Sequence, residues 1–240
     1  MKTNKIVKLA ISGGGGRMGS SVWDLALQNP DFEVVVVLEK TGHPLVGQMK
    51  NNLVVSNNPD EIKKTDVLIE FTTPESTIHH LSYAKKYKKA MVIGTTELSN
   101  DHVRQIKEAA NSIPILFSSN MSIGVNFLFD LVPKIAKKLG PEWDIEIIEV
   151  HHKGKKDAPS GTAKKFSQLI SEVVGREIPT HSLRIGDVAG DHIIVFASQG
   201  ERIEIIHRAQ SPVLFARGAL TMTKKLVTLP PGLYEPKDLL

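Results

Sequence analysis

The chain has 240 residues, of which 41% are hydrophobic and 23% charged. This excludes a fibrous or disordered protein and is typical of one large or two modest soluble domains. Cysteine is absent, which excludes disulfides and thiolate metal ligands. The formal net charge of +4 includes many lysine pairs spread over the chain, and aromatic residues make up only 5%. This pattern predicts a solvated surface and no nucleic-acid partner, but it suits anionic small molecules.

The apolar run at the start of the chain is short and is interrupted by Lys8. A secretory signal needs a longer apolar core followed by a small-residue cleavage site. No stretch approaches the ~20 apolar residues of a membrane-spanning helix. We therefore expect a soluble, cytoplasmic protein without a membrane partner.

The first half of the chain alternates continuous apolar runs with segments of helical spacing. The apolar runs predict strands at 6–12, 32–38, 66–72, 90–94 and 113–117. The helical spacing predicts helices at 18–28, 74–86 and 100–110. Strands of this kind, alternating with helices, are typical of a parallel sheet covered on both faces. The sequence therefore predicts a Rossmann-like, doubly wound α/β unit.

The pattern changes after residue 122. Helices are predicted at 122–139, 160–175 and 212–225, and strands at 144–152, 182–185, 192–198 and 201–208. Gln199-Gly200 forms a hairpin turn between the last two strands. These elements predict an α+β unit with an open mixed sheet. Pro-Pro-Gly near Pro230 predicts a loop before a C-terminal tail.

Four consecutive glycines, Gly13–Gly16, separate the first strand from the first helix, and Gly19 follows within that helix. Such glycines let the backbone approach a pyrophosphate, and the helix amino end offers N–H groups to it. Arg17 adds a cation beside the phosphates. Glu39 comes about 20 residues later, directly after the second strand, where an acidic residue binds the adenosine ribose. A flexible loop with an unrelated surface glutamate is the competing interpretation, and it leaves this joint placement unexplained.

Glu39 also bears on the choice of cofactor. Its carboxylate suits the ribose hydroxyls of NADH and repels the 2′-phosphate of NADPH, while the neighbouring Lys40 offsets that repulsion. We expect both cofactors to work, with NADH at least comparable.

The segment EVHHKGKKDAPSGT at 149–162 ends a strand, crosses a basic loop and enters a helix. Adjacent strand residues point to opposite faces, so His151 and His152 need not share a role. The hydroxyls and first-turn amides of Ser160-Gly161-Thr162 make a carboxylate cradle. Metal binding is an alternative that the neighbouring lysines disfavour, because cations repel a metal ion. Solvated histidines on a surface loop are the structural alternative.

The run EVHHKGKKDAPSGTA resembles the signature of the dihydrodipicolinate reductase (4-hydroxy-tetrahydrodipicolinate reductase) family at every fixed position of H-H-x-x-K-x-D-A-P-S-G-T-A. The stretches GGGGRMG, EFTTPE, SNMSIGVN and FARGA resemble further parts of that family, in order along the chain. The resemblance implies reduction of 4-hydroxy-tetrahydrodipicolinate to tetrahydrodipicolinate with NADH or NADPH, in lysine and diaminopimelate biosynthesis.

The resemblance also implies roles for single residues. His151 matches the family's proposed acid/base and Lys155 its proposed proton donor. The residues that would contact the substrate's carboxylates are His152, Ser160, Gly161 and Thr162. The residues that would line the cofactor site are Gly13, Gly14, Gly15, Gly16, Arg17, Met18, Glu39, Lys40, Gly94, Thr95, Thr96, Ser118, Ser119, Asn120 and Met121. No metal is implied.

The family's organisation implies a dinucleotide-binding domain of residues 1–122 and 211–240. Residues 123–210 would form a substrate-binding and oligomerisation domain, with a homotetramer formed through its sheets. Four positions depart from the usual pattern: Lys40 for arginine, Glu70 for aspartate, Glu97 for glycine and Met121 for an aromatic residue. They bear on cofactor preference and nicotinamide packing.

Two alternatives remain at this stage. A different two-domain nicotinamide reductase would share only the cofactor half and would not need the histidine–lysine segment. A non-catalytic dinucleotide-binding regulator would bind NADH without turnover.

Overall fold

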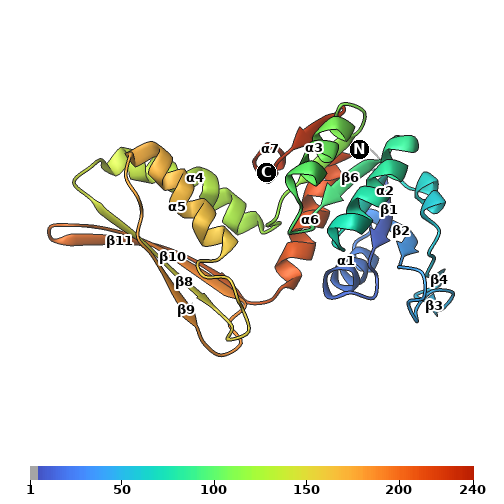
Figure 1. Ribbon diagram of the computed structural model, residues 1–240, viewed down its shortest axis with the longest axis horizontal. Helices are drawn as coiled ribbons and strands as arrows, with labels where there is room; N and C mark the ends of the chain where they lie inside the picture. The colour runs from blue at the N-terminus through green and yellow to red at the C-terminus, as the bar shows by residue number, and fades with distance from the viewer. Residues whose placement is uncertain (1–4) are drawn as a thin grey trace. The chain divides into compact units, whose positions relative to one another are not determined.

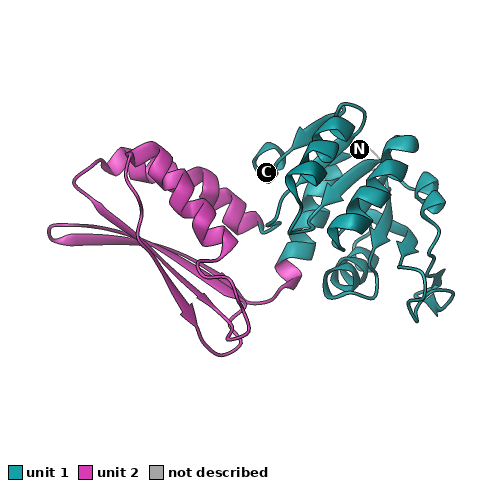
Figure 2. Ribbon diagram, viewed as in Figure 1, with its two compact units in different colours: residues 1–122, 215–240 teal, residues 123–214 magenta. Residues whose placement is uncertain are grey.

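The computed structural model describes residues 5–240, which divide into two compact units (Figure 1). Unit 1 contains the described chain up to Ser122 and again from Phe215 to Leu240, and unit 2 contains Ile123–Leu214 (Figure 2, teal and magenta). The second unit is therefore an insertion in the chain of the first. None of the helices within residues 5–240 combines the length and the apolar character of a membrane span.

Unit 1 is built on a parallel six-stranded sheet in the order β12-β7-β6-β5-β1-β2. Its strands are β1 (Val7–Ser12), β2 (Phe32–Leu38), β5 (Val67–Glu70), β6 (Ala90–Ile93), β7 (Pro114–Phe117) and β12 (Gly232–Tyr234). Its helices are α1 (Arg17–Leu27), η1 (Pro59–Lys64, a 3₁₀ helix), α2 (Pro74–Lys86), α3 (Asn100–Ala110), α6 (Val213–Leu226) and α7 (Pro236–Leu239). A small hairpin, β3 (Met49–Lys50) and β4 (Leu53–Val54), completes it.

The buried strands serve two cores, one on each face of the sheet. In β1, Leu9 and Ile11 pack with apolar residues of α1 and α6, whereas Ala10 packs with α2 and α3. Alternate residues of a strand point to opposite faces, so a strand covered on both faces must be apolar throughout. The prediction of a doubly wound sheet is confirmed.

The end of the chain differs from the prediction. Beyond Pro230 the sequence predicts a loop and a tail, but β12 adds a parallel edge strand to the sheet, with Leu233 opposite Ile115 of β7. A strand of three residues is too short to show a period of two, and the prolines before it obscured its start.

Unit 2 has a mixed four-stranded sheet in the order β11-β10-β8-β9, in which only the β8–β9 pair is parallel. Its elements are α4 (Ile123–Leu139), β8 (Asp144–His151), α5 (Gly161–Val174), β9 (Thr180–Arg184), β10 (Gly190–Ser198) and β11 (Glu201–Ala209). Phe166 and Ile170 of α5 pack on Ile147 and Phe196 of the sheet, with α4 alongside (Figure 1). The predicted open mixed sheet is confirmed.

One strand of unit 2 lies slightly earlier than expected. β9 runs from Thr180 to Arg184, whereas the sequence predicts a strand at 182–185. In this register Arg184 stands opposite His151 at the end of β8. The sheet therefore brings an arginine from β9 to the start of the histidine–lysine segment.

Candidate active site

The glycine turn joins β1 to α1 and is tied to the neighbouring strand. Gly13 has φ of +70°, in the left-handed region that favours glycine, and its amide donates to the Leu38 carbonyl at 2.8 Å. A Cβ at Gly19 would lie only 2.0 Å from the Gly13 carbonyl oxygen. The helix therefore packs against the turn so closely that only glycine fits, as in dinucleotide-binding turns.

Glu39 lies beside this turn, directly after β2. Its carboxylate accepts hydrogen bonds from the main-chain N–H of Gly15 at 2.7 Å and of Lys40 at 3.2 Å. Arg17 and Lys40 are exposed. The residue predicted to bind the ribose and the turn predicted to bind the pyrophosphate are thus brought together.

The other predicted cofactor residues follow β6 and β7. The Gly94 amide donates to the Glu70 carbonyl at 2.9 Å, and the Ser118 amide donates to the Ile93 carbonyl at 3.1 Å. Since β1, β6 and β7 are parallel, their following loops share the carboxyl edge of the sheet, where ligands bind in this class of fold. The Met121 side chain differs, because it is 1% exposed and belongs to the core of unit 1.

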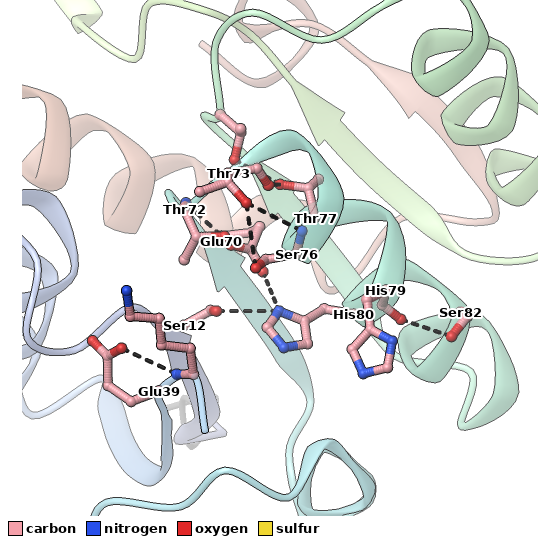
Figure 3. Close-up of polar contacts among 12 residues, drawn as sticks. Ser12, Glu39, Glu70, Thr72, Thr73, Ser76, Thr77, His79, His80 and Ser82 are labelled. Atoms are coloured by element: carbon pink, nitrogen blue, oxygen red, sulfur yellow. Dashed lines mark hydrogen bonds and ion pairs between the residues drawn. The ribbon is translucent and has the colours of Figure 1, made fainter. Parts of the chain in front are cut away.

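A polar network that the sequence did not predict lies beneath the turn. The His80 Nδ1 atom of α2 lies 2.7 Å from the Glu70 carboxylate of β5 and 3.2 Å from the Ser12 hydroxyl of β1 (Figure 3). Glu70 is fully buried, and it also accepts hydrogen bonds from the amide and hydroxyl of Thr72. The network joins three elements at the carboxyl edge. Its sequence signal is a glutamate at the end of an apolar strand.

In unit 2, His151 is the last residue of β8, and its side chain is buried. Its Nδ1 atom hydrogen-bonds the Glu149 carboxylate, which is fully buried and pairs with both terminal nitrogens of Arg184 at 2.7 and 2.9 Å. Burial raises the pKa of Glu149, but hydrogen bonds from Arg184, Ser182 and His151 outweigh it and hold that pKa at about 2. The carboxylate is therefore ionised at neutral pH.

The imidazole of His151 is neutral at neutral pH. Burial lowers its pKa below the ordinary value, and the opposing effect of Glu149 does not restore it. With Nδ1 donating to an ionised carboxylate, Nε2 carries the lone pair. The group can accept a proton or a hydrogen bond at Nε2.

The predicted helix start is confirmed at Ser160, which caps α5 by accepting a hydrogen bond from the Ala163 amide at 3.2 Å. The Ser160 amide donates to the Glu149 carboxylate at 3.1 Å. Its hydroxyl also contacts His192 of β10 at 3.2 Å. Gly161 opens the helix, where N–H groups lack an acceptor within the helix. The Ser160 cap of α5 and the buried His151 therefore share the carboxylate of Glu149.

His192 is another buried histidine of unit 2 that was not predicted from the sequence to belong to the site. It is 4% exposed, and burial lowers its pKa to about 4, so it is neutral at physiological pH. Its alternation with apolar neighbours in β10 hid it among core positions.

Lys155 lies in the loop between β8 and α5, and it is ion-paired with Asp157 at 2.7 Å rather than with His151. His152 is exposed, which agrees with the prediction that the two adjacent histidines point apart. The structure thus joins His151 to Ser160 through Glu149 and places Lys155 in the connecting loop.

Within residues 5–240, no group of three or more histidine, aspartate or glutamate side chains is placed to hold a metal ion. A cavity of about 530 Å³ in unit 1 is lined by Val7, Ala90 and Pro114, the first residues of β1, β6 and β7. It lies at the amino edge of the sheet, away from the glycine turn, and we assign it no part in the chemistry.

A glycine turn and an acidic residue on a doubly wound sheet, with an acid–base cluster in a second unit, define a nicotinamide-dependent oxidoreductase. Two family models match nearly the whole chain: dihydrodipicolinate reductase, N-terminus, over residues 7–121, and dihydrodipicolinate reductase, C-terminus, over residues 124–240. The chain belongs to the dihydrodipicolinate reductase family, which carries out a reduction step of lysine and diaminopimelate biosynthesis.

Individual relatives of known name support the same family assignment. The 4-hydroxy-tetrahydrodipicolinate reductase of Syntrophus aciditrophicus is 37% identical over 264 residues, covering 98% of each chain. That of Syntrophobacter fumaroxidans is 38% identical over 259 residues, covering 95% of this chain and 97% of its own.

Solved structures extend the comparison. A dipicolinate-bound dihydrodipicolinate reductase from Paenisporosarcina sp. TG-14 has a TM-score of 0.85 at 25% identity, covering 98% of this chain and 100% of that one. The DAP dehydrogenase of C. glutamicum, solved in complex with DAP, has a TM-score of 0.58 at 14% identity, covering 98% and 94%, and shares the fold alone.

Proposed function

We propose that this enzyme reduces 4-hydroxy-tetrahydrodipicolinate to tetrahydrodipicolinate, with NADH or NADPH bound by unit 1 and the substrate bound by unit 2. The observation that carries the proposal is the sharing of Glu149 between the neutral His151 and the Ser160 cap of α5, with Lys155 in the loop between them. This arrangement offers a proton acceptor, a proton donor and a carboxylate cradle within one segment.

Unit 1 suits the dinucleotide. The close approach of Gly19 to the Gly13 carbonyl packs α1 tightly on the turn, as in dinucleotide-binding turns, so the amino end of the helix lies at the glycine run. Gly13–Met18 would hold the pyrophosphate, and Glu39 and Lys40 the adenosine ribose. Gly94–Thr96 and Ser118–Asn120 would hold the nicotinamide half, with only the main chain of Met121 available to it because its side chain is buried. When bound, the reduced cofactor supplies a hydride.

NADH should serve at least as well as NADPH. The Glu39 carboxylate is fixed to the turn by the Gly15 amide, so a 2′-phosphate would meet a negative charge that is held in place. The exposed Lys40 beside it provides partial compensation. Both cofactors are therefore proposed to work, without a strong preference for NADPH.

Unit 2 suits a small dicarboxylate. The amino end of α5 offers the Gly161 amide and the Thr162 side chain, and its dipole favours negative charge. His152 and the loop lysines add donors around it, and the buried Ser160 holds the helix start through its contacts with Glu149 and Ala163. The related Paenisporosarcina enzyme was solved with dipicolinate, a dicarboxylate, which supports this class of substrate here.

The chain's own groups account for the proton. Loss of water from the 4-hydroxy substrate would give the conjugated imine that accepts the hydride. As hydride addition builds negative charge on that ring, the Lys155 ammonium donates a proton to it, and Asp157 holds the ammonium in place beforehand. The neutral His151 offers its Nε2 lone pair to a substrate N–H or to a water. The cationic loop stabilises the dianion throughout.

We also propose a cytoplasmic homotetramer. One face of the unit 2 sheet is not covered by α4 and α5, and it carries Leu183 and Ile206 at 42% and 41% exposure. Their partners in register, Val150 and Ile193, lie on the same face. A second copy of this face would bury it. Light scattering should show a tetramer that Ile206→Glu dissociates, and a monomeric wild type would refute the assembly.

The decisive experiment follows NADH absorbance while freshly prepared product of the preceding synthase is added as substrate. Absorbance should fall in proportion to the substrate added, and pyridine-2,6-dicarboxylate, a planar analogue, should inhibit. Cofactor binding without any turnover would instead favour a non-catalytic dinucleotide-binding protein.

A further inference from the structure

The buried cluster around Glu149 contains two charged residues for which the proposed reaction has no direct role. The Glu149 side chain has no accessible surface, so it cannot touch a substrate directly. The Arg184 side chain is 18% exposed. Residues 149 and 184 lie on the adjacent parallel strands β8 and β9. A buried ion pair of this kind adds little net stability compared with apolar packing, so its presence here calls for another explanation.

Each oxygen of the Glu149 carboxylate contacts two nitrogen atoms. Oε2 contacts Nδ1 of His151 and accepts from one terminal nitrogen of Arg184 at 2.9 Å. Oε1 accepts from the Ser160 amide at 3.1 Å and from the other terminal nitrogen of Arg184 at 2.7 Å. The carboxylate is therefore held in one orientation, and that orientation fixes both His151 and the first turn of α5.

Arg184 extends this linkage to the catalytic loop. One of its terminal nitrogens also donates to the Asp157 carbonyl at 2.5 Å, and the other donates to the Leu183 carbonyl at 2.7 Å. The Asp157 side chain in turn pairs with Lys155. One guanidinium thus connects the strand that carries His151 with the loop that carries the proposed proton donor.

We infer that Arg184 and Glu149 are positioning residues that set the tautomer of His151 and hold it in register with Lys155 and the α5 cradle. The inference rests on the proposed function for its catalytic meaning, but the tautomer is a property of the substrate-free protein. Direct substrate binding by Arg184 is the competing interpretation. It is disfavoured because both terminal nitrogens already donate to protein oxygens.

The charged groups around His151 determine how its pKa should change when Glu149 is replaced. It is faced by Glu149 on its own strand, Arg184 on β9, Lys155 in the loop and His192 on β10. Burial lowers the His151 pKa most, Glu149 opposes this, and Lys155 and Arg184 lower it further. Removing the Glu149 charge leaves only effects that lower the pKa, so the protonation step should move to more acidic pH.

The test uses the full-length protein with Glu149→Gln and Arg184→Met, and with Arg176→Met as the matched control. Arg176 also donates to a main-chain carbonyl, that of Trp143, but it has no carboxylate partner among the described contacts. Long-range ¹H–¹⁵N spectra of the substrate-free protein should show His151 protonated at Nδ1 in the wild type and in the control. Both test variants should show a mixture of tautomers or protonation at Nε2.

A change in the tautomer of His151 should lower the turnover rate. We expect kcat to fall at least tenfold in both test variants with the dissociation constant for NADH unchanged, because unit 1 is untouched. In Glu149→Gln the His151 protonation step should move down by about one pH unit. Arg184→Lys, which keeps the charge but not the paired geometry, should recover part of the activity, and it replaces Arg184→Met if that variant does not fold.

Two results would overturn the inference. One is an unchanged His151 tautomer in folded Glu149→Gln and Arg184 variants. The other is a loss in the Arg184 variants confined to KM for the dicarboxylate, which would make Arg184 a substrate ligand. The first result does not depend on whether the wild type reduces the proposed substrate, since the spectra are recorded without it.

Discussion

The main-chain N–H of Gly15 donates a 2.7 Å hydrogen bond to the carboxylate of Glu39. This bond ties the turn that would bind the pyrophosphate to the residue that would bind the ribose. Glu39 cannot move away from an incoming 2′-phosphate without losing that bond. We therefore expect Glu39 to act as a fixed determinant of cofactor choice.

Replacing this glutamate should change the cofactor preference. We expect Glu39→Ala to shift the ratio of kcat/KM values about tenfold toward NADPH, or ~1.4 kcal/mol, because a fixed negative charge near the 2′-phosphate is removed. Glu33→Ala is the control, since Glu33 is an exposed residue of β2 with only a distant lysine partner. A wild type that prefers NADPH by more than roughly a hundredfold, ~2.7 kcal/mol, would contradict this account.

The proposed proton donor can be tested by truncation. Lys155→Ala should lower kcat by ~10²–10⁴ while the protein remains folded, because a positioned acid is lost. Steady-state kinetics and thermal unfolding by circular dichroism measure the two quantities. The exposed Lys137→Ala, on α4 of the same unit and outside this loop, should behave like the wild type. Near-normal turnover of Lys155→Ala would assign proton donation to another group.

The loop after β6 carries a strained residue. Glu97 has φ of +62°, a conformation that costs a residue with a Cβ about 1–2 kcal/mol. Glu97→Gly should therefore raise the free energy of unfolding by about 0.5–1 kcal/mol after the extra chain entropy of glycine is subtracted. Urea unfolding measures the change. Glu108→Gly, on the exposed face of α3, should instead lower the free energy of unfolding by about 1 kcal/mol, because glycine is a poor helix former. A less stable Glu97→Gly protein would show that the side chain makes a compensating contact.

Acid should destabilise unit 2 through its buried histidines. Burial lowers the pKa of His192 from 6.5 to about 4. Between pH 6.5 and pH 4, His192 is therefore protonated in the unfolded chain but not in the folded chain. Stability should fall as the pH decreases through this range, and burial of His151 acts in the same direction. In His192→Gln the loss of unfolding free energy between pH 7 and pH 4.5 should be smaller than in the wild type. Gln199→Ala, in the exposed turn between β10 and β11, removes no titratable group and should leave it unchanged, and equal slopes for both variants would refute the assignment.

Local features of the site could be predicted from the sequence because their signals are local. The glycine turn lies between one strand and the next helix, and Ser160 caps the helix that directly follows it. The continuous apolar runs revealed the parallel sheet for the same reason. The assignment of the individual site residues stays a prediction until the experiments above are done.

Partners far apart in the sequence could not be predicted. Arg184 reaches Glu149 across 35 positions, and only the parallel pairing of β8 with β9 makes them neighbours. The contact of His80 with Ser12 depends likewise on where α2 packs against the sheet. β12 was missed because three residues carry no periodic signal.

The insertion of unit 2 into unit 1 has a consequence for biosynthesis. The sheet of unit 1 gains its last strand, β12, and much of one core layer, from α6, only from residues beyond 212. Unit 2 is a continuous stretch of chain, so it leaves the ribosome complete before α6 and β12 of unit 1 have been synthesised. Nascent chains arrested before α6 should therefore contain a protease-resistant second unit and a vulnerable first one.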